Sequence, residues 1–163
     1  MQQSAKEPTI IRTGYEVVKT VDGDGLIVRN IFTKKEEEIR LYGIDAPEIK
    51  KCSKLTQDER ETHLPGSFLI TLGYKAFDYL RKKVKPGTKV TIIQESHNTE
   101  DKYGRTLAYV ILPNGTSINE MMLKNGYVKA YDKIYCSKLP EYQALYLKAK
   151  RKKKGLFKEV LNF

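Results

Sequence analysis

Residues 40–48 of the chain read Arg-Leu-Tyr-Gly-Ile-Asp-Ala-Pro-Glu. Apolar side chains recur in and just before this stretch at partly alternating positions, namely Ile39, Leu41 and Ile44. This pattern predicts a half-buried strand, which Pro47 ends because proline has no amide hydrogen for a neighbouring strand. The strand then holds the cation of Arg40 next to a turn that carries the carboxylates of Asp45 and Glu48. A surface turn with ordinary solvated charges is the alternative.

The segments on either side of this stretch predict a small barrel. Five segments with alternating or β-branched residues are expected as strands: 15–21, 26–31, 38–44, 89–95 and 106–112. Three segments are expected as helices: 67–84, 118–124 (with Ser117 as its N-cap) and 139–154. Residues 52–65 are polar and lack a helical period, so they are expected as a long loop. The fold class is therefore α+β, a five-stranded OB-fold barrel with about three α-helices.

Length and composition favour one ordered domain. The chain has 163 residues, of which 40% are hydrophobic, with 11 Tyr and 5 Phe among them, so it can close one core. We expect a flexible tail over residues 1–13, a single domain over 14–158 and a short C-terminal tail over 159–163. No apolar run is long enough to cross a membrane, and the N-terminus lacks the apolar centre of a signal peptide.

The positive net charge of the chain indicates which class of partner it binds. The formal net charge is +10, and a basic domain rich in tyrosine suits a polyanion better than a neutral metabolite. Nucleic acid is the first candidate and an anionic membrane surface is the second. The second finds no support, because no amphipathic segment with exposed aromatic residues is apparent.

Four carboxylates are candidates for a metal site: Asp22, Asp24, Asp45 and Glu48. Hard divalent cations take oxygen ligands, so a pair of aspartates, a backbone carbonyl and waters suits calcium better than zinc. The alternative is that Asp22-Gly-Asp-Gly25 is a tight hairpin turn with nothing bound.

Two arginines, Arg40 and Arg105, complete this set of candidate residues. Cleavage of a phosphodiester builds negative charge on phosphorus, and a guanidinium can bind that charge with two parallel hydrogen bonds. The alternative for each arginine is a surface salt bridge.

Three motifs occur in this order along the chain: Asp-Gly-Asp at 22–24, Arg-Leu-Tyr-Gly-Ile-Asp-Ala-Pro-Glu at 40–48 and Asp-Lys-Tyr-Gly-Arg at 101–105. Together they resemble the staphylococcal nuclease (thermonuclease) family, and the resemblance runs from about Tyr15 to Phe157. It implies an OB-fold barrel and a calcium-dependent enzyme that cleaves DNA and RNA, with a preference for single strands, leaving 3′-phosphate ends. A monomer is expected.

The resemblance also implies a role for individual residues. Asp24, Asp45 and the backbone carbonyl of Ala46 are expected to bind Ca²⁺, with Glu48 as general base. Arg40 and Arg105 are expected to bind the phosphate, and Lys102 and Tyr103 to contact a terminal phosphate of the nucleotide. Tyr131 is expected either to stack on a base or to pack in the core. Gly25 stands where the family often has Thr, so a hydroxyl beside the metal is missing.

Two cysteines, Cys52 and Cys136, are either independent thiols or one disulfide, and no zinc-ligand spacing joins them to His63 or His97. The resemblance places both cysteines on loops that border the same site, which implies a disulfide. Such a bond would imply a secreted or periplasmic enzyme. Two unpaired thiols in a cytoplasmic protein remain the alternative.

The main rival to an active nuclease is a nucleic-acid-binding module of the same fold that has lost catalysis. Such modules lack some of the acids and arginines. All five expected catalytic and metal-binding side chains are present here, which favours the enzyme.

Overall fold

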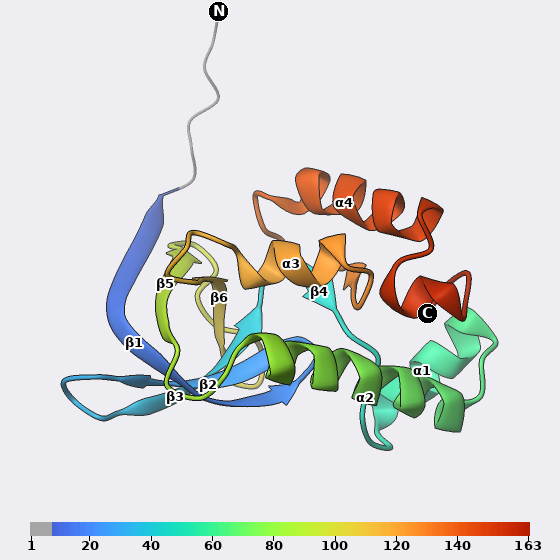
Figure 1. Cartoon of the computed structure of the whole chain (residues 1–163), viewed down its shortest axis with the longest axis horizontal. Coiled ribbons are helices and arrows are strands. Elements are labelled where there is room, and N and C mark those ends of the chain that lie inside the picture. The colour runs from blue at the N-terminus through green and yellow to red at the C-terminus, as the bar shows by residue number, and fades with distance from the viewer. Residues whose placement is uncertain (1–7) are drawn as a thin grey trace, which may run out of the picture.

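Five strands close into a barrel in a computed structural model that describes residues 8–163 (Figure 1). The strands are β1 (Thr9–Asp22), β2 (Gly25–Asn30), β3 (Glu36–Leu41), β5 (Lys89–Glu95) and β6 (Thr106–Ile111). Their order around the barrel is β1-β2-β3-β6-β5; the β3–β6 pair is parallel and the other pairs are antiparallel. The predicted OB-fold-like barrel is confirmed, and the predicted bounds of β5 match those observed.

β1 is longer than predicted because it pairs with both β5 and β2. Its pairing with β5 begins at Thr9 and shifts register between Arg12 and Tyr15, where Gly14 has a φ of 79°. Glycine takes this conformation without steric cost, so the strand can bend there and continue along β2. Residues 9–13, which we expected in a tail, therefore belong to the barrel, and residues 1–7 of that tail lie outside the described part of the chain.

Residues 8–163 contain four α-helices, whereas the sequence predicted about three. They are α1 (Ser53–Thr62), α2 (Gly66–Lys83), α3 (Ile118–Lys124) and α4 (Leu139–Arg151), and a short 3-10 helix, η1 (Gly155–Lys158), follows. α2 packs against β1, α3 against β6 and α4 against α3 (Figure 1). The Ser117 side chain accepts a hydrogen bond from the amide of Glu120, so the predicted N-cap of α3 is confirmed.

α1 is the helix that the sequence did not predict. Only Leu55 and Asp58 of its ten residues are buried, so no apolar period marks it as a helix. The expected loop over 52–65 is wrong because contacts with other elements stabilise this polar helix. Leu55 packs in a cluster with Leu69 and Leu72 of α2.

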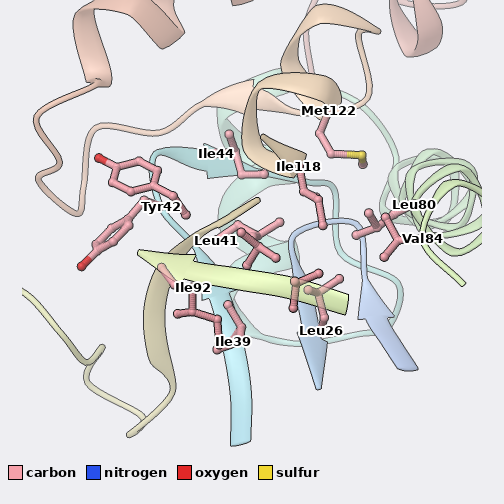
Figure 2. Close-up of a cluster of buried hydrophobic side chains, with 14 of the residues drawn as sticks. Leu26, Ile39, Leu41, Tyr42, Ile44, Leu80, Val84, Ile92, Ile118 and Met122 are labelled. Carbon is pink, nitrogen blue, oxygen red and sulfur yellow. The ribbon is translucent and has the colours of Figure 1, made fainter. Parts of the chain in front are cut away.

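The main core fills the barrel and extends under the helices. Figure 2 shows Leu26, Ile39, Leu41 and Ile92 from the strands, Leu80 and Val84 from α2 and its C-cap, and Ile118 and Met122 from α3. A second cluster joins α1, α2, α4 and η1, and it includes Leu156, Phe157 and Phe163. Because the Phe163 ring stacks on Phe157 at 4.9 Å, the chain end packs on the domain instead of forming the expected tail.

The predicted strand 38–44 is interrupted at Gly43, which has a φ of 72°. A Cβ at this position would lie 2.7 Å from the Tyr142 ring and 2.9 Å from the Cys136 sulfur, so only glycine fits. After Gly43 the chain forms β4 (Ile44–Asp45), which pairs with β7 (Lys129–Ala130). This two-stranded sheet fixes the start of the turn that carries Asp45 and Glu48.

The implied disulfide is wrong, because both cysteines are free. Cys136 is buried against Gly43, whereas Cys52 is exposed at the N-cap of α1. The prediction of a secreted or periplasmic enzyme depended on this disulfide, so it loses that support. In the described part of the chain, no helix is long and apolar enough to cross a bilayer.

Candidate active site

Strand pairing brings Asp24, Arg40 and Asp45 together. β2 pairs with β3 so that Gly25 faces Arg40, and the amide of Leu41 donates to the Asp24 carbonyl at 3.0 Å. Asp24 ends the tight turn between β1 and β2, and Asp45 ends β4. The side chains of these three residues are 4–8% exposed, so they form a buried charged group at the edge of the barrel.

Arg40 connects the two aspartates. Its Nη2 lies 3.4 Å from Asp24 Oδ2 and 3.4 Å from Asp45 Oδ1. Its Nη1 donates to the backbone carbonyls of Leu41 at 2.9 Å and Ile44 at 2.8 Å. Burial by itself would lower the pKa of this guanidinium, but the charges of Asp24 and Asp45 raise it above its ordinary value. Arg40 therefore remains charged in a fixed orientation.

The surroundings of Asp24 hold it in place but do not fully balance its charge. The amide of Ala46 donates to Asp24 Oδ2 at 2.8 Å, and the amide of Asp24 donates to Asp22 Oδ1 at 3.1 Å. Burial raises the pKa of the Asp24 carboxyl to about 7, against the opposing charge of Arg40. Asp22 thus supports the turn, and Asp24 is the carboxyl that reaches Arg40.

Glu48 lies on the turn beyond Asp45 and is half-buried. Burial raises the pKa of its carboxyl to about 6, and the charges of Asp24 and Asp45 add to the rise. A Cβ at Gly73 of α2 would lie 2.5 Å from the Glu48 carbonyl oxygen, so the helix backbone directly supports this turn.

The sequence did not indicate three charged residues near Asp45: two lysines that contact it and one aspartate that contacts the first of these lysines. Lys54 Nζ on α1 lies 3.0 Å from Asp45 Oδ2 and 2.7 Å from Asp58 Oδ1. Lys129 Nζ on β7 lies 3.9 Å from Asp45 Oδ2. The i,i+4 spacing of Lys54 and Asp58 is a helical signal that could have pointed to α1. Nothing in the local sequence indicated that either lysine would contact Asp45.

Arg105 lies in a separate loop with Lys102 and Tyr103. Its Nε donates to Asp101 Oδ2 at 2.7 Å and lies 3.8 Å from Glu38 Oε2. Tyr103 is 72% exposed, and both Lys102 Nζ (5.2 Å) and the Arg105 guanidinium carbon (5.6 Å) lie near its ring centroid.

Arg105, Lys102 and Tyr103 therefore lie together, and the acidic partners of Arg105 are Asp101 and Glu38. The described part of the chain contains no ion pair between Arg105 and Asp24 or Asp45.

Tyr131 lies beside the charged group. Its amide donates to the Gly43 carbonyl at 2.8 Å, and the guanidinium carbon of Arg40 lies 5.6 Å from its ring centroid. The ring is half-buried. The Tyr131 ring therefore packs beside the Arg40 guanidinium and is only partly covered by other residues.

The donor atoms suit a hard divalent cation, although few acidic side chains converge. Asp24, Asp45 and the backbone of Ala46 offer oxygen atoms, as calcium requires. Over residues 8–163, no three His, Cys, Asp or Glu side chains are grouped as metal ligands. A cation here would therefore need the Ala46 carbonyl and waters in addition to two carboxylates.

Comparison with known proteins gives several relatives. Endonuclease YhcR of Bacillus subtilis is 32% identical over 152 residues, which cover 88% of this chain and 11% of that protein. The uncharacterized protein MJ1439 of Methanocaldococcus jannaschii is 34% identical, over 71% of this chain and 58% of that protein. The thermonuclease of Staphylococcus hyicus is 30% identical, with the same two coverages of 71% and 58%. The chain thus spans less than two thirds of the length of each of these relatives.

The family model described as "Staphylococcal nuclease homologue" matches residues 38–159, about three quarters of the chain. The match includes Arg40, Asp45, Glu48 and the 101–105 loop. The matched region starts at residue 38 and so does not include Asp24, which the pairing of β2 with β3 places beside Arg40. From this match and the barrel topology, the chain belongs to the staphylococcal nuclease family.

Proposed function

We propose that this chain is a nuclease that hydrolyses phosphodiester bonds in DNA or RNA. The observation that carries the proposal is the Arg40 guanidinium fixed between the carboxylates of Asp24 and Asp45, with Glu48 on the adjoining turn. The names of the relatives, endonuclease and thermonuclease, support the same reaction class.

Arg40 stabilises the charge of the transition state in this proposal. Its orientation is set by two backbone carbonyls and two carboxylates before any substrate arrives. A donor that is already oriented loses little free energy on reorganisation, so it is most effective where new negative charge forms on phosphorus. Arg105, Lys102 and Tyr103 bind a neighbouring phosphate from their exposed loop.

Glu48 acts as general base. It accepts a proton from the attacking water, the new oxygen–phosphorus bond forms, and the bond from phosphorus to the 5′ oxygen breaks. The 5′ oxygen takes a proton from a solvent water as it leaves, and Glu48 later returns its own proton to solvent, so the products are a 3′-phosphate and a 5′-hydroxyl. Tyr131 offers a ring beside Arg40 on which an unpaired base can stack, which favours single-stranded substrate.

Calcium is the proposed metal ion, held by the carboxylates of Asp24 and Asp45 and the backbone carbonyl of Ala46. When bound, it supplies a Lewis acid and a fixed position for the phosphate oxygens. We propose that the enzyme acts as a monomer.

A cleavage assay with a single-stranded DNA oligonucleotide tests the proposal, run with CaCl₂ and then with excess EGTA. We expect cleavage with calcium, none with EGTA, and 3′-phosphate ends on the products. Glu48→Gln should bind calcium like the parent chain and cleave far more slowly, whereas Asp24→Ala should lose calcium affinity. A parental rate for Glu48→Gln would remove Glu48 as the base, and absence of cleavage by the parent chain would favour a binding module.

A further inference from the structure

Lys54 places a cation on a carboxylate that the proposed function assigns to the metal. Its Nζ lies 3.0 Å from Asp45 Oδ2, 2.7 Å from Asp58 Oδ1 and 2.8 Å from Asp58 Oδ2. An ammonium has three donors, so each can be engaged by one of these three oxygens. The side chain of Asp45 is 4% exposed and that of Asp58 is 7% exposed, so little water competes for these contacts.

The carboxylates of Asp24, Asp45 and Asp58 each already have a cationic partner. Three carboxylates, those of Asp24, Asp45 and Asp58, lie among three cations, those of Arg40, Lys54 and Lys129. A divalent cation that joins this group adds two positive charges at short range. Lys54 is the cation nearest to Asp45, at 3.0 Å, whereas Arg40 lies 3.4 Å away and is also held by two backbone carbonyls, and Lys129 lies 3.9 Å away.

We propose that Lys54 is a built-in competitor of the divalent cation and sets the metal affinity of the site. It contacts Oδ2 of Asp45 and would give up that oxygen when the cation binds. Asp58, one helical turn along α1, then keeps the ammonium paired, so its release leaves no buried charge alone. The inference rests on the proposed function, because it requires that Asp45 bind the metal.

This competition also connects metal binding to α1. Lys54 belongs to the first turn of α1, and its bond to Asp45 is a polar contact between that helix and the candidate active site. Loss of this bond leaves the start of α1 held mainly by Leu55 in its apolar cluster with α2, while Glu61 near the end of the helix still pairs with Lys133. Cation binding should therefore loosen the start of α1 while α2 remains unchanged.

Calcium titration by calorimetry on the full chain tests the proposal, with CaCl₂ alone as the probe. The variant Lys54→Met/Asp58→Asn removes the competitor and its partner and leaves the net charge unchanged. It should bind calcium about tenfold more tightly than the parent chain. Lys51→Met is the control, because Lys51 is exposed and makes no ion pair in the described part of the chain. Its affinity should change less than twofold.

A second measurement needs no substitution. Saturating calcium should speed hydrogen exchange of the α1 amides several-fold in the parent chain, with no such change in α2. Equal or weaker calcium affinity in Lys54→Met/Asp58→Asn, or unchanged exchange in α1, would overturn the inference and leave the proposed nuclease intact. If no form of the chain binds calcium, both the inference and the proposed metal site fail.

Discussion

Arg40 shows how one side chain can serve the fold and the proposed chemistry together. Its Nη1 satisfies two carbonyls where β3 ends and β4 begins, and its Nη2 meets both aspartates. A planar guanidinium can make all four contacts at once because its donors diverge in fixed directions. An ammonium at the same position has three donors around one atom and cannot reach both sets.

This difference predicts the behaviour of Arg40→Lys. The variant keeps the charge and loses the fixed donor geometry, so turnover of a single-stranded oligonucleotide should fall about 10²-fold or more. The effect should lie mainly in kcat, since the stabilised charge is largest in the transition state. Steady-state kinetics with saturating calcium check it.

The control for Arg40→Lys is Arg29→Lys on neighbouring β2. Arg29 is 37% exposed and pairs with Glu16 and Glu36 at the surface. Turnover should remain near the parental value in this variant. Near-parental turnover in Arg40→Lys itself would reduce Arg40 to a structural ion pair.

At the scale of elements, α2 supports the turn that carries Glu48. The closest contacts at Gly73 are backbone atoms: a Cβ there would lie 2.5 Å from the Glu48 carbonyl oxygen and 2.6 Å from that of Pro47. Backbone atoms cannot rotate away as a side chain can. The spacing between helix and turn is therefore set by the absence of a side chain at Gly73.

Gly73→Ala should move the turn and destabilise the fold. Overpacking of this kind typically costs about 1–3 kcal/mol, which exceeds the gain of about 1 kcal/mol from replacing glycine inside a helix. Urea unfolding should show a net loss of stability, and turnover should fall because Glu48 is displaced. Thr71→Ala, at an exposed position of the same helix, should change neither quantity appreciably. A Gly73→Ala variant that is more stable than the parent chain would contradict this packing argument.

The elements also show what could be read from the sequence. β5 and α2 were predicted within a residue of their observed bounds because each has an apolar period that one buried face requires. Asp24 and Arg40 were grouped through the motifs of the family resemblance, and the structure shows that the tight turn at 22–25 and the β2–β3 hairpin bring them together. Strands joined by a short turn are close in the sequence, so the pairing between their residues depends on nearby residues alone.

α1 and Lys54 were missed for the opposite reason. α1 has two buried residues, and its position depends on Leu55 entering a cluster built by distant helices. The contact from Lys54 to Asp45 exists only once that helix is in place. The predicted disulfide was wrong for the same reason, because it depended on packing between distant segments. Cys136 is buried in the core beside Gly43, whereas Cys52 is exposed.

At the scale of the whole molecule, a polar network joins strands that are not all neighbours. Arg12 on β1 donates to Glu37 on β3 at 3.2 Å and to Gln94 on β5 at 3.3 Å. Thr106 on β6 donates to the same Glu37 at 2.7 Å. Four of the five barrel strands therefore meet in one charged hydrogen-bond network.

Glu37→Gln should reveal this network through the pH dependence of stability. Burial opposes ionisation of Glu37, but hydrogen bonds from Arg12 and Thr106 hold its pKa below the ordinary value of 4.5. A lowered pKa in the folded state gives stability that is fully present above pH 4.5 and is lost as the pH falls through the folded-state pKa.

The parent chain should thus exceed Glu37→Gln in unfolding free energy by about 1.5–3 kcal/mol at pH 7. The difference should shrink below pH 4.5, as urea unfolding at several pH values would show. Glu36→Gln, whose side chain is 49% exposed, is the control and should lose less than about 0.5 kcal/mol. If the difference in unfolding free energy between the parent chain and Glu37→Gln stays constant down to about pH 3, the lowered pKa of Glu37 is not the cause of the stabilisation.

Net charge governs how the whole molecule meets its proposed substrate. The chain carries +10, and Arg151, Lys152, Lys153 and Lys154 form an exposed run that makes no ion pair in the described part of the chain. Cations that are not neutralised internally can displace the counterions of a nucleic acid strand, and the gain from counterion release falls as salt is added. Binding should therefore depend steeply on salt even where catalysis does not.

Fluorescence anisotropy with a labelled single-stranded oligonucleotide tests this, using Glu48→Gln in EGTA so that the strand is not cleaved. For about four phosphate contacts, a slope of about −0.7 per contact predicts that affinity falls about 50-fold between about 50 and about 200 mM salt. An oligomer with an uncharged backbone and the same bases should bind far more weakly and show little dependence on salt. Salt-independent binding of the charged strand would mean that base stacking, at Tyr131 or Tyr103, dominates over phosphate contacts. The positive charge of the molecule would then serve solubility alone.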